Sequence, residues 1–152
     1  MESFLKREGG AIDFEKRKKT RSFLYFNNEF QLMGYFSLCV KNFIFSEDVI
    51  KSLRRNIDGF NANSESAVVY LIGQLGRDNR YSLKGFGAEL LKDAVDCLLE
   101  VQNYVGGRYC LIETEKTNTN QKVIDFYRRN GFTDLQEDNK DDITYLQLVA
   151  KL

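Results

Sequence analysis

The spacing of apolar residues changes along the chain between a period of two and a period near four, which predicts a mixture of strands and helices. Aromatic and β-branched residues gather in short runs that are typical of strands. We expect strands over Arg21–Phe26, Phe30–Phe45, Val68–Arg77, Arg108–Glu113 and Ile143–Val149, and a short one at Phe132–Thr133. We expect helices over Ile12–Lys19, Glu47–Ile57, Gly87–Glu100 and Asn120–Asn130.

Glycine and serine residues mark several of the expected boundaries. Gly34 predicts a bulge within its strand. Gly73 and Gly76 interrupt another strand, which indicates either a bulge or a ligand that approaches the backbone closely. Ser46 is the expected N-cap of the helix that follows it, and Gly131 is a favoured residue just after a helix end.

A glycine-rich turn, Lys84–Ala88, joins the Val68–Arg77 strand to the next helix. Free N–H groups at a helix start carry a partial positive charge, and glycine lets a phosphate come close to the backbone. The turn is therefore a candidate anion site, although many helices begin after a glycine only because the turn needs one. The strand, helix, strand order makes Arg108–Glu113 parallel to Val68–Arg77.

Composition narrows the chemistry. The chain has 152 residues, of which 43% are hydrophobic, and we expect one domain over residues 1–152. It has no histidine, and Cys39, Cys97 and Cys110 stand far apart, which argues against a metal site, a disulfide framework and histidine-based catalysis. The apolar runs are too short to span a bilayer and the start lacks a signal-peptide core, so we expect a cytoplasmic protein with no membrane partner.

Charge is balanced overall but uneven along the chain. The 22 basic and 22 acidic residues give a net charge of +0, which argues against binding nucleic acid through total charge. Lys16–Arg21 and Lys51–Arg55 are basic, whereas Asp134–Asp142 is acidic and is interpreted as a turn before the last strand. Short charge runs are most often solvated faces.

Two segments together resemble the GNAT N-acetyltransferase superfamily. Asn120–Phe132 is similar to that family's segment from an asparagine to Phe-Tyr-x-x-x-Gly-Phe. Leu75–Leu91 resembles its acetyl-CoA segment, Gln/Arg-x-x-Gly-x-Gly/Ala followed by a Leu-Leu helix, except that Ser82 stands where Gln or Arg is usual. The resemblance implies an α+β fold with α/β/α layers. Its mixed, mostly antiparallel sheet would contain a central parallel strand pair splayed into a V, with helices on its flanks.

The resemblance also implies the site residues. Acetyl-CoA, as co-substrate, would lie in the V, and Asn120 would bind its pantetheine amides. Tyr127 would protonate the departing thiolate, the backbone of Leu75 would stabilise the oxyanion, and Glu113 is a candidate base. Without the resemblance, Tyr127 reads as a core residue and Glu113 as a solvated strand end. The expected cofactor-binding residues are Leu75, Gly76, Arg77, Arg80, Ser82, Leu83, Lys84, Gly85, Phe86, Gly87, Ala88, Asn120 and Tyr127.

Three functions stay open. The first is transfer of acetyl from acetyl-CoA to an unspecified primary amine by direct attack. The second is a toxin-like enzyme that acetylates the amino group of aminoacyl-tRNA, because Gly34–Leu38 resembles the Gly-Tyr-Tyr-Ser-Leu pattern of such toxins. In that case the two basic runs would contact RNA and an antitoxin would be the partner. The third is a non-catalytic acyl-CoA-binding regulatory domain. A homodimer is a further expectation, since dimers are common in the family.

Overall fold

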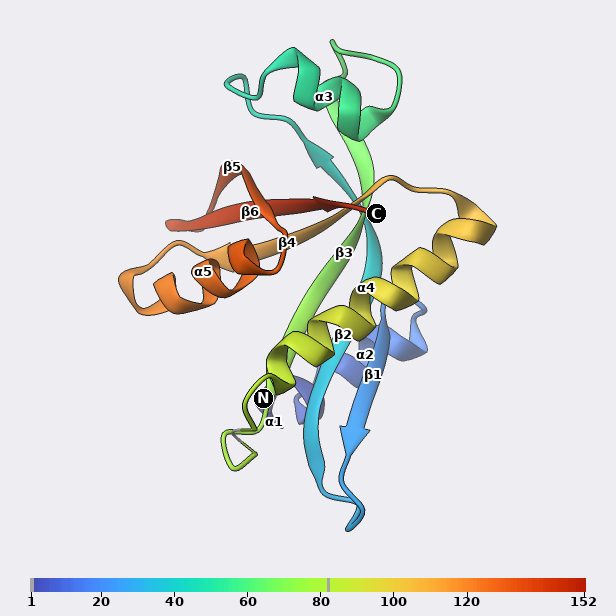
Figure 1. Cartoon of the computed structure of the whole chain (residues 1–152), viewed down its shortest axis with the longest axis vertical. Helices are drawn as coiled ribbons and strands as arrows, with labels where there is room; N and C mark the ends of the chain where they lie inside the picture. Colours follow the sequence, from blue (N-terminus) through green and yellow to red (C-terminus); the bar gives the residue numbers. More distant parts are fainter. Residues whose placement is uncertain (1, 82) are drawn as a thin grey trace.

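A mixed sheet organises the chain, and its strand order is β1-β2-β3-β4-β6-β5 (Figure 1). The computed structural model describes residues 2–81 and 83–152, so the predicted contact of Ser82 lies outside the described residues. The strands are β1 (Arg21–Phe26), β2 (Leu32–Ile44), β3 (Ser66–Arg77), β4 (Tyr109–Glu115), β5 (Thr133–Lys140) and β6 (Ile143–Lys151). The helices are α1 (Glu2–Lys6), α2 (Ala11–Lys16), α3 (Lys51–Asp58), α4 (Phe86–Val105) and α5 (Gln121–Arg129), the last preceded by a 3₁₀ turn at Asn118–Asn120.

The parallel pair β3 and β4 separates soon after it forms. The two strands are paired only at Tyr70↔Cys110 and Leu71↔Leu111, whereas every other neighbouring pair of strands is antiparallel. Beyond this point β3 continues beside β2 while β4 turns away with β6 (Figure 1). Gly73 is the extra residue between Ile72 and Gln74 in the register with β2, so the expected bulge is present at this glycine. The expected sheet with a splayed parallel pair is confirmed.

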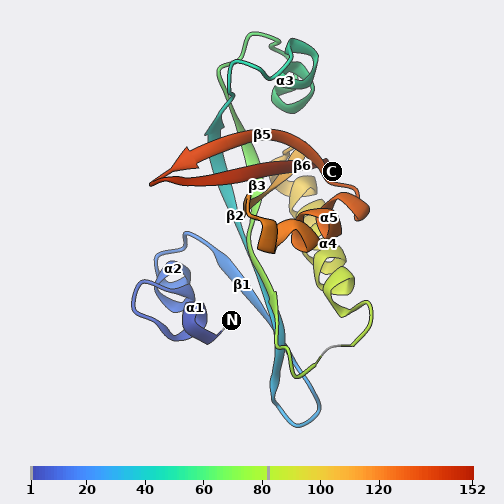
Figure 2. The ribbon, with the colours of Figure 1, turned by 90° about the vertical axis from the view of Figure 1, so that its left-hand side faces the viewer.

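Helices cover both faces of the sheet. Figure 2 shows α4 and α5 on one side and α1 and α2 on the other. The apolar stripe of α4 faces the sheet, and its Leu90 is fully buried in the same core cluster as Phe36 and Leu148. On the other side Phe4 of α1 stacks on Tyr35 with ring centroids 6.1 Å apart. No helix in the described ranges has the length and apolar character needed to cross a membrane.

The acidic segment after α5 is a strand, so its interpretation as the turn Asp134–Asp142 is wrong. β5 occupies most of it, and only Asp141 and Asp142 form the turn, both with positive φ. Gln136 explains the difference, because it is 8% exposed and its amide reaches distant groups. Its Nε2 donates to the Ile44 carbonyl at 2.8 Å, and its Oε1 accepts from the Ser46 N–H at 2.8 Å. These bonds hold a polar sequence at the sheet edge.

Two helix predictions also need correction, and one helix, α1, was not predicted. The helix expected at Glu47–Ile57 starts only at Lys51, and Ser46 does not cap it, because the N–H of Ser46 is bound by Gln136 and its hydroxyl bonds Asp48. α4 continues to Val105, beyond its predicted end. α1 lies in a stretch that gave little sequence signal, and its packing on the sheet accounts for it.

We predict that Gln136→Ala lowers the free energy of unfolding by about 3 kcal/mol, because it leaves several buried polar groups without partners. The Nε2 of Gln136 also donates to Gln147 Oε1 at 2.9 Å within the sheet. Urea denaturation measures the change. Gln121→Ala is the matched control, because that side chain makes an exposed hydrogen bond to Asp125. Equal stability of the two variants would show that the Gln136 bonds do not hold β5.

Candidate active site

A groove of about 710 Å³ opens where β4 has left β3. The end of β3, the start of α4 and one side of α5 form its walls. The lining residues are Leu75, Gly76, Arg77, Lys84, Gly85, Gly87, Ala88, Leu90, Lys122, Val123, Phe126, Tyr127, Arg129 and Asn130. The groove thus borders the β3 side of the V, and none of its lining residues belongs to β4.

The groove is strongly cationic although the whole chain is neutral. Arg77, Lys84, Lys122 and Arg129 line it, and no carboxylate does. None of these four side chains makes an ion pair within residues 2–81 and 83–152. Arg128, by contrast, is bound to Asp134 at 2.6 Å and to Asp125. Four uncompensated cations around one groove favour a ligand with several negative charges.

The start of α4 adds backbone donors to the groove. Gly85 precedes the helix with φ 89°, a left-handed conformation that favours glycine. The N–H of Phe86 bonds the Leu83 carbonyl at 3.2 Å and the N–H of Ala88 bonds the Gly85 carbonyl at 2.9 Å. The N–H groups of Gly85 and Gly87 make no hydrogen bond to the part of the chain that the structure describes. These two N–H groups, rather than those of Phe86 and Ala88, are left to bind an anion.

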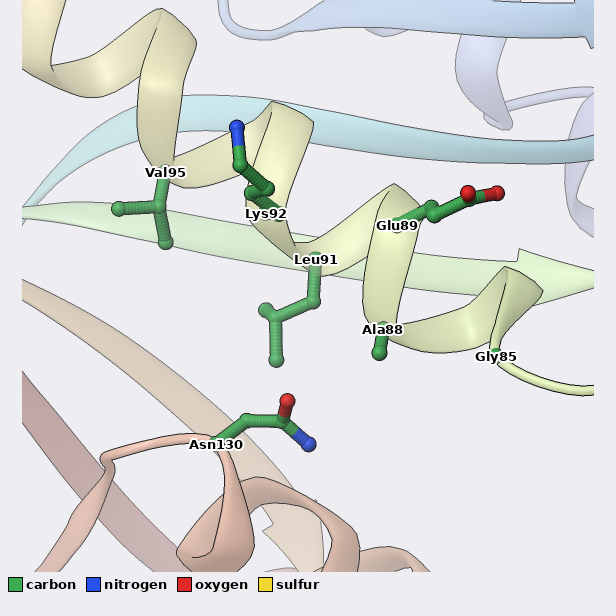
Figure 3. A pocket seen from close by; sticks show the side chains of 7 residues that line it. All are labelled: Gly85, Ala88, Glu89, Leu91, Lys92, Val95 and Asn130. Carbon is green, nitrogen blue, oxygen red and sulfur yellow. The ribbon is translucent and has the colours of Figure 1, made fainter.

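A second pocket, of about 490 Å³, continues the groove along the outside of α4. It shares Gly85, Ala88 and Asn130 with the groove. Figure 3 shows Leu91 of α4 pointing toward Asn130 at the end of α5. A ligand longer than the groove can extend between these two helices.

A backbone N–H group of β3, that of Leu75, points into the V. The N–H of Asp78 donates to the Met33 carbonyl of β2 at 2.7 Å. Because N–H groups alternate between the two sides of a strand, Gly76 turns toward β2 and Leu75 turns toward the open side that β4 has left. The N–H of Leu75 is therefore available to a ligand in the V.

Tyr127 combines a buried ring with a free hydroxyl. The residue is 7% exposed, and its ring lies 5.2 Å from that of Phe126 and 6.0 Å from that of Phe132. Burial raises the pKa of Tyr127 to about 12, which keeps the phenol protonated at neutral pH. The hydroxyl has no hydrogen-bond partner among the described residues, and Tyr127 lines the groove. A protonated, unbound phenol at a groove can donate a proton or a hydrogen bond to a ligand.

Glu113 is held in an ion-pair network. It lies on β4 opposite Gln147 of β6, whose Nε2 donates to its Oε1 at 2.7 Å, and Lys41 bonds its Oε2 at 2.6 Å. Lys140 lies 3.5 Å away. Burial alone would raise the pKa of Glu113, but the bonds from Lys41 and Gln147 and the nearby lysine charges outweigh it and lower the pKa. A carboxylate held in this way is a weak proton acceptor, so the arrangement does not support Glu113 as the base.

Some expected cofactor contacts do not reach the groove. Asn120 turns its amide toward the Glu115 carbonyl, 3.2 Å away, at the start of α5. Arg80 is paired with Asp78 at 2.6 Å, Leu83 is exposed and Phe86 is buried in the core. Conversely, Lys122 and Arg129 line the groove but were missed. Their separation of seven residues, two helical turns, was the available signal.

No protein-family model and no curated protein matches the sequence, whereas solved structures do. AtaT complexed with acetyl-methionyl-tRNAfMet is 22% identical, with a TM-score of 0.71 over 92% of this chain and 75% of that one. The chain has the GNAT fold. A tyrosine-to-phenylalanine mutant of the AtaT toxin, bound to the C-terminus of the antitoxin AtaR and acetyl-CoA, is 20% identical, with a TM-score of 0.65 over 92% and 72% of the two chains. A tyrosine-to-phenylalanine mutant of KacT is 20% identical, with a TM-score of 0.71 over 98% and 79%.

The GNAT fold accounts for the arrangement of the site. The cationic groove adjoins β3 beyond the positions at which it pairs with β4, and it extends to the start of α4. Within the described residues, no group of three or more acidic or cysteine side chains is placed to hold a metal ion. Among the described residues, the free hydrogen-bond donors at the groove are backbone N–H groups, basic side chains and the Tyr127 phenol.

We predict that Glu113→Gln lowers the free energy of unfolding at neutral pH and that this difference shrinks in acid. The pKa of Glu113 is lowered in the folded state, so its stabilising effect is present above the unfolded pKa, near 4.5, and is lost as the pH falls below it. Urea denaturation between about pH 7 and about pH 3 tests this. Glu137→Gln, which removes a half-exposed pair with Lys116, is the control and should show little dependence. A gap that stays constant with pH would contradict the assignment.

Proposed function

We propose that this chain is an acetyl-CoA-dependent N-acetyltransferase that acetylates a primary amine by direct attack. The observation that carries the proposal is the cationic groove, which runs from an open parallel strand pair to the two free N–H groups of Gly85 and Gly87. Coenzyme A is a long polyanion with an apolar arm, and this groove is lined by both basic and apolar side chains. A structural neighbour bound to acetyl-CoA supports the same assignment.

Each part of the groove would bind one part of the co-substrate. Gly85 and Gly87 N–H groups, with Lys84, would hold the diphosphate at the helix start. Lys122 and Arg129 would neutralise further phosphate charge from α5. Acetyl-CoA supplies an activated acetyl group when it is bound. The N–H of Leu75 would stabilise negative charge on the carbonyl oxygen, a contribution of about 3 kcal/mol for such donors.

Tyr127 would act as the general acid. As the amine nitrogen bonds the acetyl carbon, the carbon–sulfur bond breaks and the sulfur leaves as a thiolate. The phenol of Tyr127 lines the groove and has no other partner among the described residues, so its position allows it to give that thiolate a proton. Because Glu113 is neutralised by lysines, the proton that the amine loses would pass to water.

We predict that the wild-type protein binds acetyl-CoA and that Lys122→Met with Arg129→Met weakens this binding at least about 10-fold. At 100 times Kd, acetyl-CoA should stabilise the wild type by about 2.7 kcal/mol. Isothermal calorimetry and thermal shift measure both effects. Lys51→Met is the control, because that exposed lysine lies on α3, away from the groove. Equal affinities for all three proteins would contradict the phosphate assignment.

We predict that Tyr127→Phe lowers kcat by about 100-fold or more while acetyl-CoA still binds, because the ring stays packed and only the proton donor is lost. Thiol release during incubation with spermidine, a methionyl peptide and methionyl-tRNA measures turnover. A loss of less than about 5-fold would assign Tyr127 to packing alone. Binding of acetyl-CoA without thiol release with any amine would instead support a non-catalytic acyl-CoA-binding domain.

The charged-tRNA acceptor is the second candidate, and the neighbour that carries acetyl-methionyl-tRNAfMet favours it. Of the basic runs proposed as RNA contacts, Lys16–Lys19 are exposed. The Arg54 side chain is already used within the fold, since it donates hydrogen bonds to the carbonyls of Ser46 and Val49. Expression that arrests growth only with an intact Tyr127 would support this acceptor, and an antitoxin would then be the expected partner. Normal growth with active protein would favour another amine.

A further inference from the structure

The sheet face opposite the groove carries a row of polar side chains that ends at the V. Ser22 of β1, Ser37 of β2 and Gln74 of β3 are register partners, and residues paired in this way point to the same face. Phe36 and Leu75, one position along, belong to the core under α4, so the polar row lies on the other face, where α1 and α2 lie (Figure 2). The row meets the V at the Gly73 bulge, just beyond the last paired residues of β3 and β4.

Ser37 is the notable member of this row. The residue is 2% exposed, and its hydroxyl makes no hydrogen bond to any residue that the structure describes. The hydroxyl oxygens of Thr20 and Ser22 are fully buried and have no hydrogen-bond partner. The Ser37 hydroxyl oxygen also has no partner, but it is not fully buried. A nearly buried serine whose hydroxyl is unpaired and keeps some solvent exposure is expected to bind a group that approaches it.

The exposed residue Gly73 lies beside this hydroxyl and leaves it uncovered. A Cβ at Gly73 would lie 3.4 Å from the Ser37 Oγ, so the space above the bulge is vacant only because the residue is glycine. On the far side of the V, Glu113 of β4 is the polar residue two positions beyond the last pair, and it is occupied by Lys41 and Gln147. On the β2–β3 side, Ser37 is the buried polar residue whose hydroxyl has no partner among the described residues, and its register partner Gln74 is exposed.

We propose that the Ser37 hydroxyl binds the attacking amine on the face opposite the acetyl-CoA groove, an inference that rests on the proposed function. Its oxygen accepts a hydrogen bond from the amine N–H, which directs the nitrogen lone pair toward the thioester in the V. The nitrogen then bonds the acetyl carbon as the carbon–sulfur bond breaks. The thiolate receives a proton from Tyr127, and the amine gives its proton to water.

The test uses hydroxylamine as the acceptor, because a nucleophile of this size needs no further recognition. Ser37→Ala should lower kcat/KM for hydroxylamine about 10-fold while the Kd for acetyl-CoA stays unchanged. The variant should be at least as stable as the wild type, because it removes a hydroxyl that has no partner. Gly73→Ala should also slow turnover, because its methyl group would cover the hydroxyl in ordinary contact.

Ser22→Ala is the matched control, since it makes the same change in the same row one strand farther from the V. It should keep wild-type activity. Wild-type turnover no faster than that of Ser37→Ala, or equal losses in Ser22→Ala and Ser37→Ala, would overturn the role of Ser37. If only the role of Ser37 is wrong, the wild type will still bind acetyl-CoA. If the wild type binds no acetyl-CoA, both the proposed function and this inference are wrong.

Discussion

The site depends on the separation of β3 from β4 after only two paired positions. Each strand beyond Leu71 and Leu111 keeps backbone N–H and C=O groups that a neighbouring strand would otherwise satisfy. Such groups need a partner, either water or a ligand. The separation thus turns the middle of a sheet, ordinarily its most rigid part, into a place where a ligand can add hydrogen bonds. The Gly73 bulge and the N–H of Leu75 both lie along this opened side.

Contacts on both faces hold the opening apart. On one face α4 packs across β2 and β3 through Leu90, while Tyr127 of α5 packs against Phe132, so each wall of the V has its own support. On the other face the Lys41–Glu113 pair crosses from β2 to β4 over the point where the strands part. Glu113 is therefore best understood as a structural tie between the two halves of the sheet, although its place at the strand end suggested a base.

Local charge, rather than net charge, distinguishes the groove. The chain carries equal numbers of acidic and basic residues. Near the site, however, acidic side chains form ion pairs with other residues, as Asp134 does with Arg128. Arg129, one residue later, is turned by the helix to the groove and is left unpaired. A neutral protein thereby places four cations around a single groove. On the opposite face of the sheet, the hydroxyl of Ser37 also makes no hydrogen bond to the described residues.

The sequence by itself determined the elements whose signals are local. The apolar stripe of α4, the glycines at Gly73, Gly85 and Gly131, and the direction of β4 follow from spacing, turn chemistry and the crossover rule. The splayed V and the GNAT fold followed from the resemblance of two segments and were confirmed. Tertiary structure alone decided which polar residues meet. β5 is a strand because Gln136 bonds a carbonyl 92 residues earlier, and Lys122, Arg129 and Ser37 acquire their places from helix rotation and strand register. Such contacts join residues far apart in the chain, so no local pattern encodes them.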